Sequence, residues 1–99
     1  MPKNIRNENI DYLFKAILSL ESIDECYDFF EDLCTISELQ EMAKRMNAAK
    51  MLHENMIYTD IVEKTGLSTA TISRVKRCLN YGNDGYASVL AKLEKKNEA

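Results

Sequence analysis

The sequence predicts an all-α protein of six helices that contains a helix-turn-helix unit. Apolar residues recur at spacings of three and four along most of the chain, which is the period of an amphipathic helix. Residues that interrupt helices are rare, because the 99 residues include one proline and three glycines. β-Branched residues are not clustered as they are in strands.

A chain of 99 residues is long enough for one domain, and we assign residues 1–99 to it. Residues 1–7 carry Lys3 and Arg6 with little apolar content, which predicts a flexible arm. Hydrophobic residues make up 45% of the chain and charged residues 29%, and this balance argues against disorder. A chain this short buries only a modest part of its surface, so dimerisation would stabilise it.

The cysteines Cys26, Cys34 and Cys78 are odd in number and lack the spacing of metal ligands. No signal peptide or long apolar segment is visible. We therefore expect a cytoplasmic protein without a membrane segment, metal or cofactor, whose reduced thiols pack as small hydrophobic side chains.

Two amphipathic helices are predicted in the first part of the chain. The apolar stripe of the first helix, which needs a partner surface in this chain or in a second copy, comprises Ile10, Leu13, Phe14, Ile17 and Leu18. Ser22 and Glu25 form a capping box before the second helix. Its apolar residues cover more than one face, which favours burial between two layers; they are Ile23, Cys26, Tyr27, Phe29, Phe30 and Leu33. Its acidic residues have no His or Cys at ligand spacing, and we interpret them as a solvated face.

A second capping box, Thr35 and Glu38, begins the longest predicted helix, from Ile36 to Asn55. The helix has a methionine-rich stripe typical of a core surface, formed by Leu39, Met42, Met46, Ala49 and Leu52. The single histidine, His53, has no nucleophile or carboxylate partner in a motif, so we expect a surface or helix-end role.

Residues Tyr58 to Asn80 predict the helix-turn-helix. Gly66 stands where the first helix must end with φ > 0, and Ser68 is a natural N-cap for the second helix. The inward-facing residues of the pair are Ile61, Val62, Thr65, Leu67, Ile72 and Val75. A turn cluster from Gly82 to Gly85 ends the unit. A last amphipathic helix then carries Tyr86, Val89, Leu90 and Leu93.

The charges are unevenly distributed along the chain, although the formal net charge is −3. From Asn7 to Glu41 there are ten acidic residues and one basic residue, Lys15, whereas Leu67 to Gly82 contains three basic residues and no acid. Electrostatic interactions are screened over about 8–10 Å at physiological salt. A local basic face can therefore bind DNA while the rest of the molecule is acidic.

The second helix of a helix-turn-helix enters the major groove, which makes its outward side the candidate DNA-binding surface. Hydroxyls at its N-terminus suit a phosphate oxygen, small side chains allow close approach to base edges, and basic side chains reach phosphates or guanine. The spacing does not decide which arginine contacts bases. The candidate DNA-binding residues are Ser68, Thr69, Ala70, Thr71, Ser73, Arg74, Lys76 and Arg77.

The stretches ELQEMAKRMNAAKML, YTDIVEKT and GLSTATISRVKRCLNYG resemble the Trp repressor superfamily, and more closely its YerC/YecD branch. The resemblance extends from Ile10 to Leu93, and TATISR is its most specific part. It implies six helices in an intertwined homodimer, with the N-terminal helices forming the shared core and the helix-turn-helix units acting as reading heads.

The resemblance also implies a possible ligand site, since tryptophan is the corepressor of the Trp repressor itself. Arg45 and Arg74 match the arginines that enclose its indole, and Thr35 and Cys78 match further ligand-contacting positions. The sequence departs from the family pattern where Val75 replaces a glycine and where Cys78, a weaker hydrogen-bond partner, replaces a serine. We therefore expect that tryptophan is not an obligatory corepressor, in which case Arg45 would be a surface or ion-pair residue.

These observations predict a homodimeric, sequence-specific DNA-binding transcription regulator, and we expect a repressor. The alternative is a helical adaptor that binds proteins through its apolar surfaces and keeps the helix-turn-helix as a scaffold. An enzyme is disfavoured, because the sequence has no phosphate-binding loop, nucleophile–base pair or metal-ligand pattern.

Overall fold

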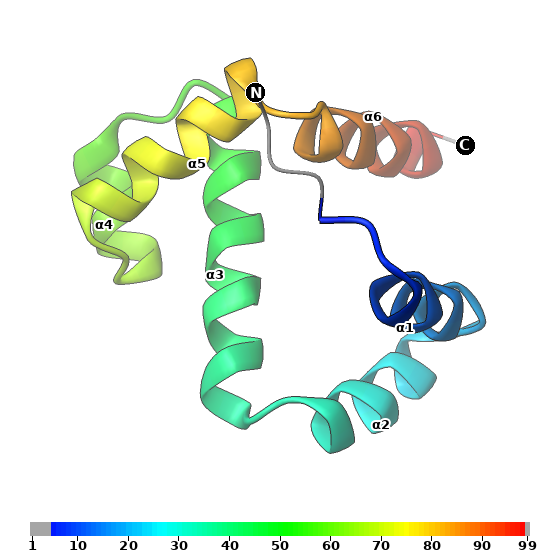
Figure 1. The fold of residues 1–99 in the computed structure, drawn as a ribbon. Helices are drawn as coiled ribbons and strands as arrows, with labels where there is room; N and C mark the ends of the chain where they lie inside the picture. Colours follow the sequence, from blue (N-terminus) through cyan, green and yellow to red (C-terminus); the bar gives the residue numbers. More distant parts are fainter. Residues whose placement is uncertain (1–4, 99) are drawn as a thin grey trace. The chain divides into compact units, whose positions relative to one another are not determined.

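The computed structural model describes residues 5–98, which form six helices and no strand (Figure 1). The helices are α1 (Glu8–Leu18), α2 (Ile23–Leu33), α3 (Ile36–His53), α4 (Tyr58–Thr65), α5 (Thr69–Tyr81) and α6 (Gly85–Glu98). The all-α prediction is confirmed. The chain divides into two compact units, Met1–Leu39 and Gln40–Ala99, which are described separately below.

Side-chain caps begin the helices of the first unit. The Asn7 side chain accepts a hydrogen bond of 2.8 Å from the Ile10 N–H, so the part of the predicted arm next to α1 is bonded to that helix. Residues 1–4 of the arm lie outside the described residues. Ser22 accepts a 3.1 Å bond from the Glu25 N–H at the start of α2, as its capping box predicts.

Helices α1 and α2 contain no buried residue. Large apolar side chains are largely exposed along both helices, including Leu18 (83%), Tyr12 (77%) and Ile23 (76%). The rings of Phe29 and Phe30 meet edge to face with 5.4 Å between their centroids. The burial between two layers that the sequence predicts for α2 is therefore not provided by the described part of a single chain.

The end of α3 differs from the prediction, because the helix ends at His53 rather than Asn55. Asn55 adopts the left-handed conformation with φ of 63°, which a helix cannot continue. Its N–H bonds to the Leu52 carbonyl oxygen, and the Met56 N–H bonds to that of Met51, both at 3.0 Å. This is a Schellman ending with asparagine in the position that glycine usually occupies.

The core of the second unit consists of two clusters that meet at adjacent alanines of α3. Ala48 belongs to a cluster of buried side chains with Ile61, Leu67 and Ile72. Ala49 belongs to the other cluster, with Val75 and Leu90. Both alanines are fully buried, and they pack against side chains of α4, α5 and α6. His53 also joins α3 to α6, since its Nε2 lies 3.3 Å from Oε1 of Glu94.

A tight turn connects α5 to α6. The Gly82 N–H bonds to the Cys78 carbonyl oxygen at 2.9 Å, and a Cβ at Gly82 would collide with that oxygen. Asp84 takes a positive φ of 63°, and α6 follows directly. The predicted turn is present, except that Gly85 is the first residue of α6 rather than part of the turn.

The cysteines are free thiols, and Cys26 and Cys34 are half-buried. Cys78 is exposed, so its predicted packing as a small core residue is wrong. Within residues 5–98, no helix has both the length and the apolar character needed to cross a bilayer.

Candidate nucleic-acid interface

Helices α4 and α5 form the predicted helix-turn-helix around two fully buried isoleucines. Ile61 of α4 and Ile72 of α5 are each 0% exposed, and Leu67 in the connecting turn is 4% exposed. Thr65 and Val75 are also buried, whereas Val62 is half-buried. The inward-facing set predicted from the sequence is therefore confirmed, and it determines which side of α5 faces away from the core.

Hydrogen bonds from side chains and backbone stabilise the turn between α4 and α5. Gly66 has φ of 74°, and its N–H bonds to the Val62 carbonyl oxygen at 2.8 Å. The buried Thr65 hydroxyl donates to the Ile61 carbonyl oxygen at 2.7 Å and accepts from the Leu67 N–H at 3.1 Å. The buried Thr65 hydroxyl thus has partners both as a donor and as an acceptor, as a buried polar group requires.

Ser68 is the N-cap of α5, as predicted. Its hydroxyl oxygen accepts from the Thr71 N–H at 3.2 Å, and its hydroxyl donates to Thr71 Oγ1 at 3.0 Å. The Ser68 proton is therefore already used within the cap, and the two hydroxyls act together. This bonding positions the first turn of α5.

The outward side of α5 is small and polar near its start and basic further along. Thr69, Ala70, Ser73, Arg74 and Arg77 are all exposed. Ala70, Ser73 and Arg77 follow the i, i+3, i+7 spacing, which places them on one stripe of the helix. Opposite this stripe lie the buried residues Ile72 and Val75, which pack on the rest of the unit.

The three basic residues of α5 have different surroundings. Arg74 is four residues after Ala70 and three before Arg77, so these three residues share one side of the helix. Arg77 is exposed there, and Arg74 also lines a cavity. The Lys76 ammonium lies over the ring of Tyr58 in α4, 5.6 Å from its centroid. The structure therefore brings Arg74 and Arg77 together on the outward side of α5, whereas Lys76 lies at the edge next to α4.

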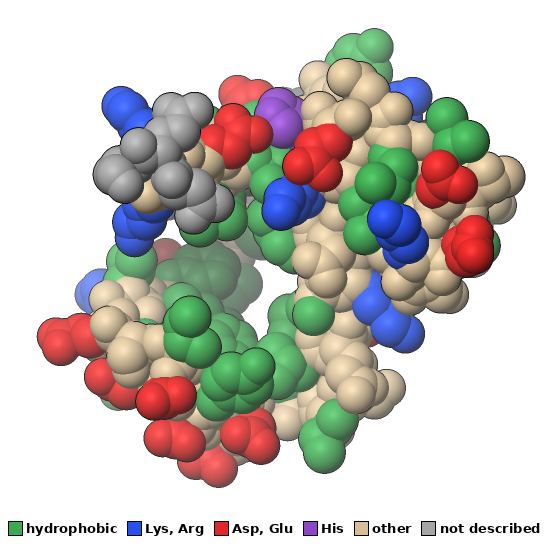
Figure 2. Space-filling model, turned by 180° about the vertical axis from the view of Figure 1, so that it is seen from behind, with side chains coloured by type: hydrophobic (Ala, Val, Ile, Leu, Met, Phe, Trp, Pro, Cys, Tyr) green, Lys and Arg blue, Asp and Glu red, His purple; other side chains and the backbone are tan. Residues whose placement is uncertain are grey.

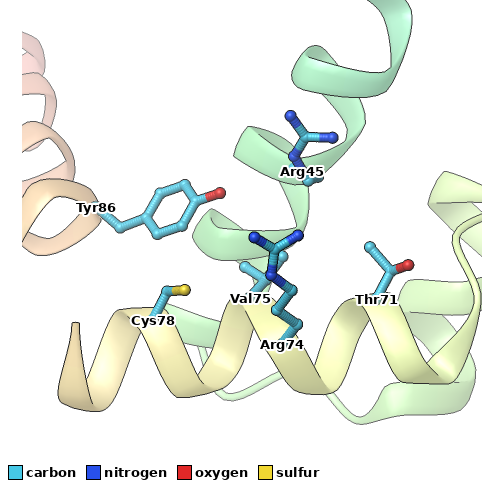
Figure 3. A pocket seen from close by; sticks show the side chains of 6 residues that line it. All are labelled: Arg45, Thr71, Arg74, Val75, Cys78 and Tyr86. Atoms are coloured by element: carbon cyan, nitrogen blue, oxygen red, sulfur yellow. The ribbon is translucent and has the colours of Figure 1, made fainter. Parts of the chain in front are cut away.

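Arg74 lines a cavity of about 190 Å³ together with Arg45, Thr71, Val75, Cys78 and Tyr86 (Figure 3). Arg45 comes from α3 and Tyr86 from α6. Figure 3 shows Arg45 and Arg74 beside the same cavity, with the Tyr86 hydroxyl directed toward it. Of the ligand-binding residues expected from the family resemblance, Arg45, Arg74 and Cys78 are thus brought together.

Thr35 is not among the residues that line this cavity. It lies in the first unit, where it completes the capping box of α3. Its hydroxyl oxygen accepts from the Glu38 N–H at 3.1 Å, and its N–H donates to the Glu38 carboxylate at 2.8 Å. The bond from the Thr35 backbone, and after it that of the side chain, lower the pKa of Glu38.

Two aromatic residues that line cavities in the structure, Tyr86 and Tyr58, are not among the site residues predicted from the sequence. Tyr86 was expected only as an apolar residue of the last helix, and Tyr58 only as the start of the helix-turn-helix. Tyr58 lines a groove of about 450 Å³ that also contains Lys76. Helical periodicity predicts Tyr86 as a residue of an apolar stripe, but it does not reveal which side chains of other helices Tyr86 and Tyr58 meet.

The acidic residues of the first unit are concentrated on its two helices. Figure 2 shows Asp and Glu side chains collected over α1 and α2. The residues that the structure describes contain no group of three or more His, Cys, Asp and Glu side chains placed to hold a metal ion.

The model of the Trp repressor protein family matches residues 8–94 of the chain. The chain belongs to the Trp repressor family. This is a family with a regulator fold rather than an enzyme family, and it supports DNA binding and transcription regulation as the general role. The match includes all of α1 to α5 and most of α6.

Individual members of the Trp repressor family are also similar to the chain. The uncharacterized protein YerC of Bacillus subtilis (strain 168) is 54% identical over 90 residues, which cover 91% of this chain and 86% of YerC. A crystal structure of a TrpR-like protein from Eubacterium eligens superposes with a TM-score of 0.88 at 57% identity, over 91% of this chain and 93% of that one. A putative Trp repressor from Staphylococcus aureus gives a TM-score of 0.87 at 48% identity, over 91% and 90%. The six helices therefore form a Trp-repressor-like fold, and the resemblance drawn from the sequence is confirmed.

Proposed function

We propose that the chain is a dimeric, sequence-specific DNA-binding transcription regulator that acts as a repressor in the cytoplasm. Helix α5 enters the major groove as its reading head. The observation that carries the proposal is the helix-turn-helix of α4 and α5, with its left-handed Gly66 turn and its Ser68 cap. These features orient a helix whose outward side is small, polar and basic.

The reading stripe consists of Thr69, Ala70, Ser73 and Arg77. Short side chains at the N-terminal end of α5 let its backbone approach base edges, and the Thr69 methyl group and Ala70 suit thymine methyls. Arg77 lies farther along the same stripe and has the length and the paired donors for a guanine edge. Arg77 is exposed and does not line the cavity at Arg45, whereas Arg74 does. This difference favours Arg77 as the arginine that contacts bases.

The remaining candidate residues position the protein on the phosphate backbone. The Ser68 and Thr71 hydroxyls bond to each other, so together they hold the first turn of α5 and present its N-terminal end to a phosphate. Arg74 adds positive charge on the same side of α5 as Ala70 and Arg77, and Lys76 adds it at the Thr69 edge. Their phosphate contacts would make DNA affinity fall as salt rises, because bound counterions are released.

Dimerisation is supported by the apolar surfaces of α1 and α2. Both helices have amphipathic stripes but no buried residue in a single chain. Large exposed apolar surfaces usually mark an interaction site in a folded protein. A second copy that covers these stripes would bury them and make both units parts of one DNA-binding domain. The two-fold symmetry of such a dimer would place its two reading heads about 34 Å apart on DNA.

The reading head does not need tryptophan to be packed against the rest of the protein. Val75 is 3% exposed and packs with Ala49 and Leu90, so its own side chain joins α5 to α3 and α6. Cys78 offers the cavity an exposed thiol, which is a weak hydrogen-bonding group. The pair of arginines at the cavity remains available to another, unidentified effector.

Selection of genomic fragments by the purified protein, followed by gel shift with competitor DNA, tests the proposal. We expect enrichment of fragments that share a two-fold symmetric sequence, and retention of the shifted complex when unrelated DNA is added. The alternative, a helical adaptor, is favoured by the same exposed apolar residues of α1 and α2. Absence of any shifted complex at low salt would favour the adaptor.

A further inference from the structure

The contact between Lys76 and Tyr58 extends the proposed DNA-binding surface beyond α5. The Lys76 ammonium lies 5.6 Å from the centroid of the Tyr58 ring, within the range in which a cation is attracted to an aromatic face. Lys76 is exposed, and Tyr58 is half-buried against the cluster that contains Ile61 and Ile72. The half-buried ring thus presents its face to a long, exposed charged side chain.

The groove around this pair is suited to an anion. It has a volume of about 450 Å³, and its polar side chains are those of Asn55, Tyr58, Lys76 and Asn80. Asn55, Lys76 and Asn80 carry N–H donors, and Lys76 adds a full positive charge. Leucine, methionine and isoleucine side chains complete the lining.

The position of the groove favours a DNA phosphate as the anion that it would bind. Tyr58 is the first residue of α4, and the first helix of a helix-turn-helix crosses the DNA backbone while the second lies in the groove. Lys76 is about 100° around α5 from Arg77 and seven residues after Thr69, so it lies at the Thr69 edge of the reading stripe, where it meets Tyr58 of α4. A cation at this edge, beside the start of α4, is placed for a backbone phosphate rather than for a base edge.

We propose that Tyr58 is a positioning residue that holds Lys76 as a phosphate anchor on the α4 flank of the reading head. The anchor adds affinity that does not depend on DNA sequence. This inference rests on the proposed DNA-binding function, and it assigns Tyr58 a role that the reading stripe does not explain.

DNA binding by four variants tests the anchor: Lys76→Gln, Tyr58→Leu, Tyr58→Phe and the Lys76→Gln/Tyr58→Leu double variant. Affinity is measured over a range of KCl concentrations, on a selected fragment and on a scrambled one. Lys76→Gln should reduce the slope of log affinity against log salt by about 0.9 and weaken both fragments by the same factor. Lys92→Gln, which removes one lysine of α6, is the matched charge control and should leave the slope nearly unchanged.

The variants of Tyr58 separate its ring from its hydroxyl. Tyr58→Leu should weaken both fragments about two- to fivefold, the range expected for one exposed cation–π contact. Tyr58→Phe should bind as the wild type does. In the double variant, loss of the ring should add nothing to the loss of Lys76, because the two residues act as one unit.

A structural readout does not depend on DNA. In NMR spectra of the free protein, the Lys76 side-chain protons should be shifted by the Tyr58 ring, and Tyr58→Phe should retain this shift. The inference is overturned if those protons show no ring shift, or if Lys76→Gln leaves the salt slope unchanged. It is also overturned if the effect of Tyr58→Leu persists fully in the double variant. A wild-type protein that binds neither fragment would instead refute the proposed function, together with the anchor that rests on it.

Discussion

The hydroxyl of Thr65 donates a 2.7 Å hydrogen bond to the carbonyl oxygen of Ile61, one helical turn earlier in α4. The same oxygen of Thr65 accepts from the Leu67 N–H at 3.1 Å. One buried side chain therefore bonds both to the last turn of α4 and to the segment that leads into α5. The angle between the two helices depends on this turn, and so does the direction in which the reading stripe faces.

Thr65→Val should lower the free energy of unfolding by about 1–3 kcal/mol, because it leaves the buried Leu67 N–H without its acceptor. The substitution keeps the shape of the side chain, and Thr65→Ser is the control that keeps the hydroxyl. Urea denaturation of both variants gives the comparison. Equal stability of the valine variant and the wild type would show that the hydroxyl does not hold the turn.

Gly66→Ala should destabilise the protein by about 1–2 kcal/mol, since a Cβ at φ of 74° is strained even in open space. Gly85→Ala is a matched control, because a Cβ there would also meet nothing within 4 Å and no positive φ is involved. Thermal unfolding of the two variants should show a clear loss for Gly66→Ala and little change for Gly85→Ala. Similar melting temperatures would contradict the strain argument.

The helices were predictable because their ends carry strong local signals. The hydroxyls of Ser22, Thr35 and Ser68 each cap a helix by accepting a hydrogen bond from the backbone N–H three residues later. Gly66 ends α4 in the left-handed conformation, which glycine adopts without steric strain. Such bonds depend on neighbouring residues alone. The end of α3 was missed because Asn55 enters the left-handed region less often than glycine does, although its side chain tolerates it.

The candidate site was only partly predictable, for a different reason. Helical periodicity identified the outward residues of α5, but it could not show that Lys76 meets Tyr58 or that Tyr86 shares a cavity with Arg45. Those contacts depend on how α3, α4 and α6 cross α5. The family resemblance supplied Arg45, Arg74 and Cys78 as a group, which no local signal in the sequence connects.

Tryptophan should not bind with micromolar affinity to the wild-type protein, because Val75 already provides the packing between α5 and the rest of the unit. Isothermal titration calorimetry with L-tryptophan measures this directly. DNA binding in the absence of any added amino acid should be as tight as in its presence. Micromolar binding, or a gain in DNA affinity on adding tryptophan, would show that the cavity at Arg45 and Arg74 holds the corepressor.

The capping box at Thr35 and Glu38 should make the start of α3 sensitive to acid. The bonds from Thr35 lower the pKa of Glu38 below its ordinary value of 4.5. A lowered folded-state pKa contributes stability that is present above the unfolded value and is lost as pH falls through the folded value. The stability difference between the wild type and Glu38→Gln should therefore be present near neutral pH and shrink below pH 4.5. An NMR titration that places the Glu38 pKa at or above its ordinary value would contradict this.

Discrimination between DNA sequences tests the proposed reading head most directly. The affinities of the purified protein for a selected genomic fragment and for a scrambled fragment of equal length are compared at one salt concentration. The wild type should prefer the selected fragment by about 10³-fold or more. Arg77→Gln should lose about 1–3 kcal/mol of binding free energy on the selected fragment and reduce the preference. Equal affinity of the wild type for both fragments, or an undiminished preference in Arg77→Gln, would contradict the assignment of α5 and its exposed stripe as the surface that reads DNA.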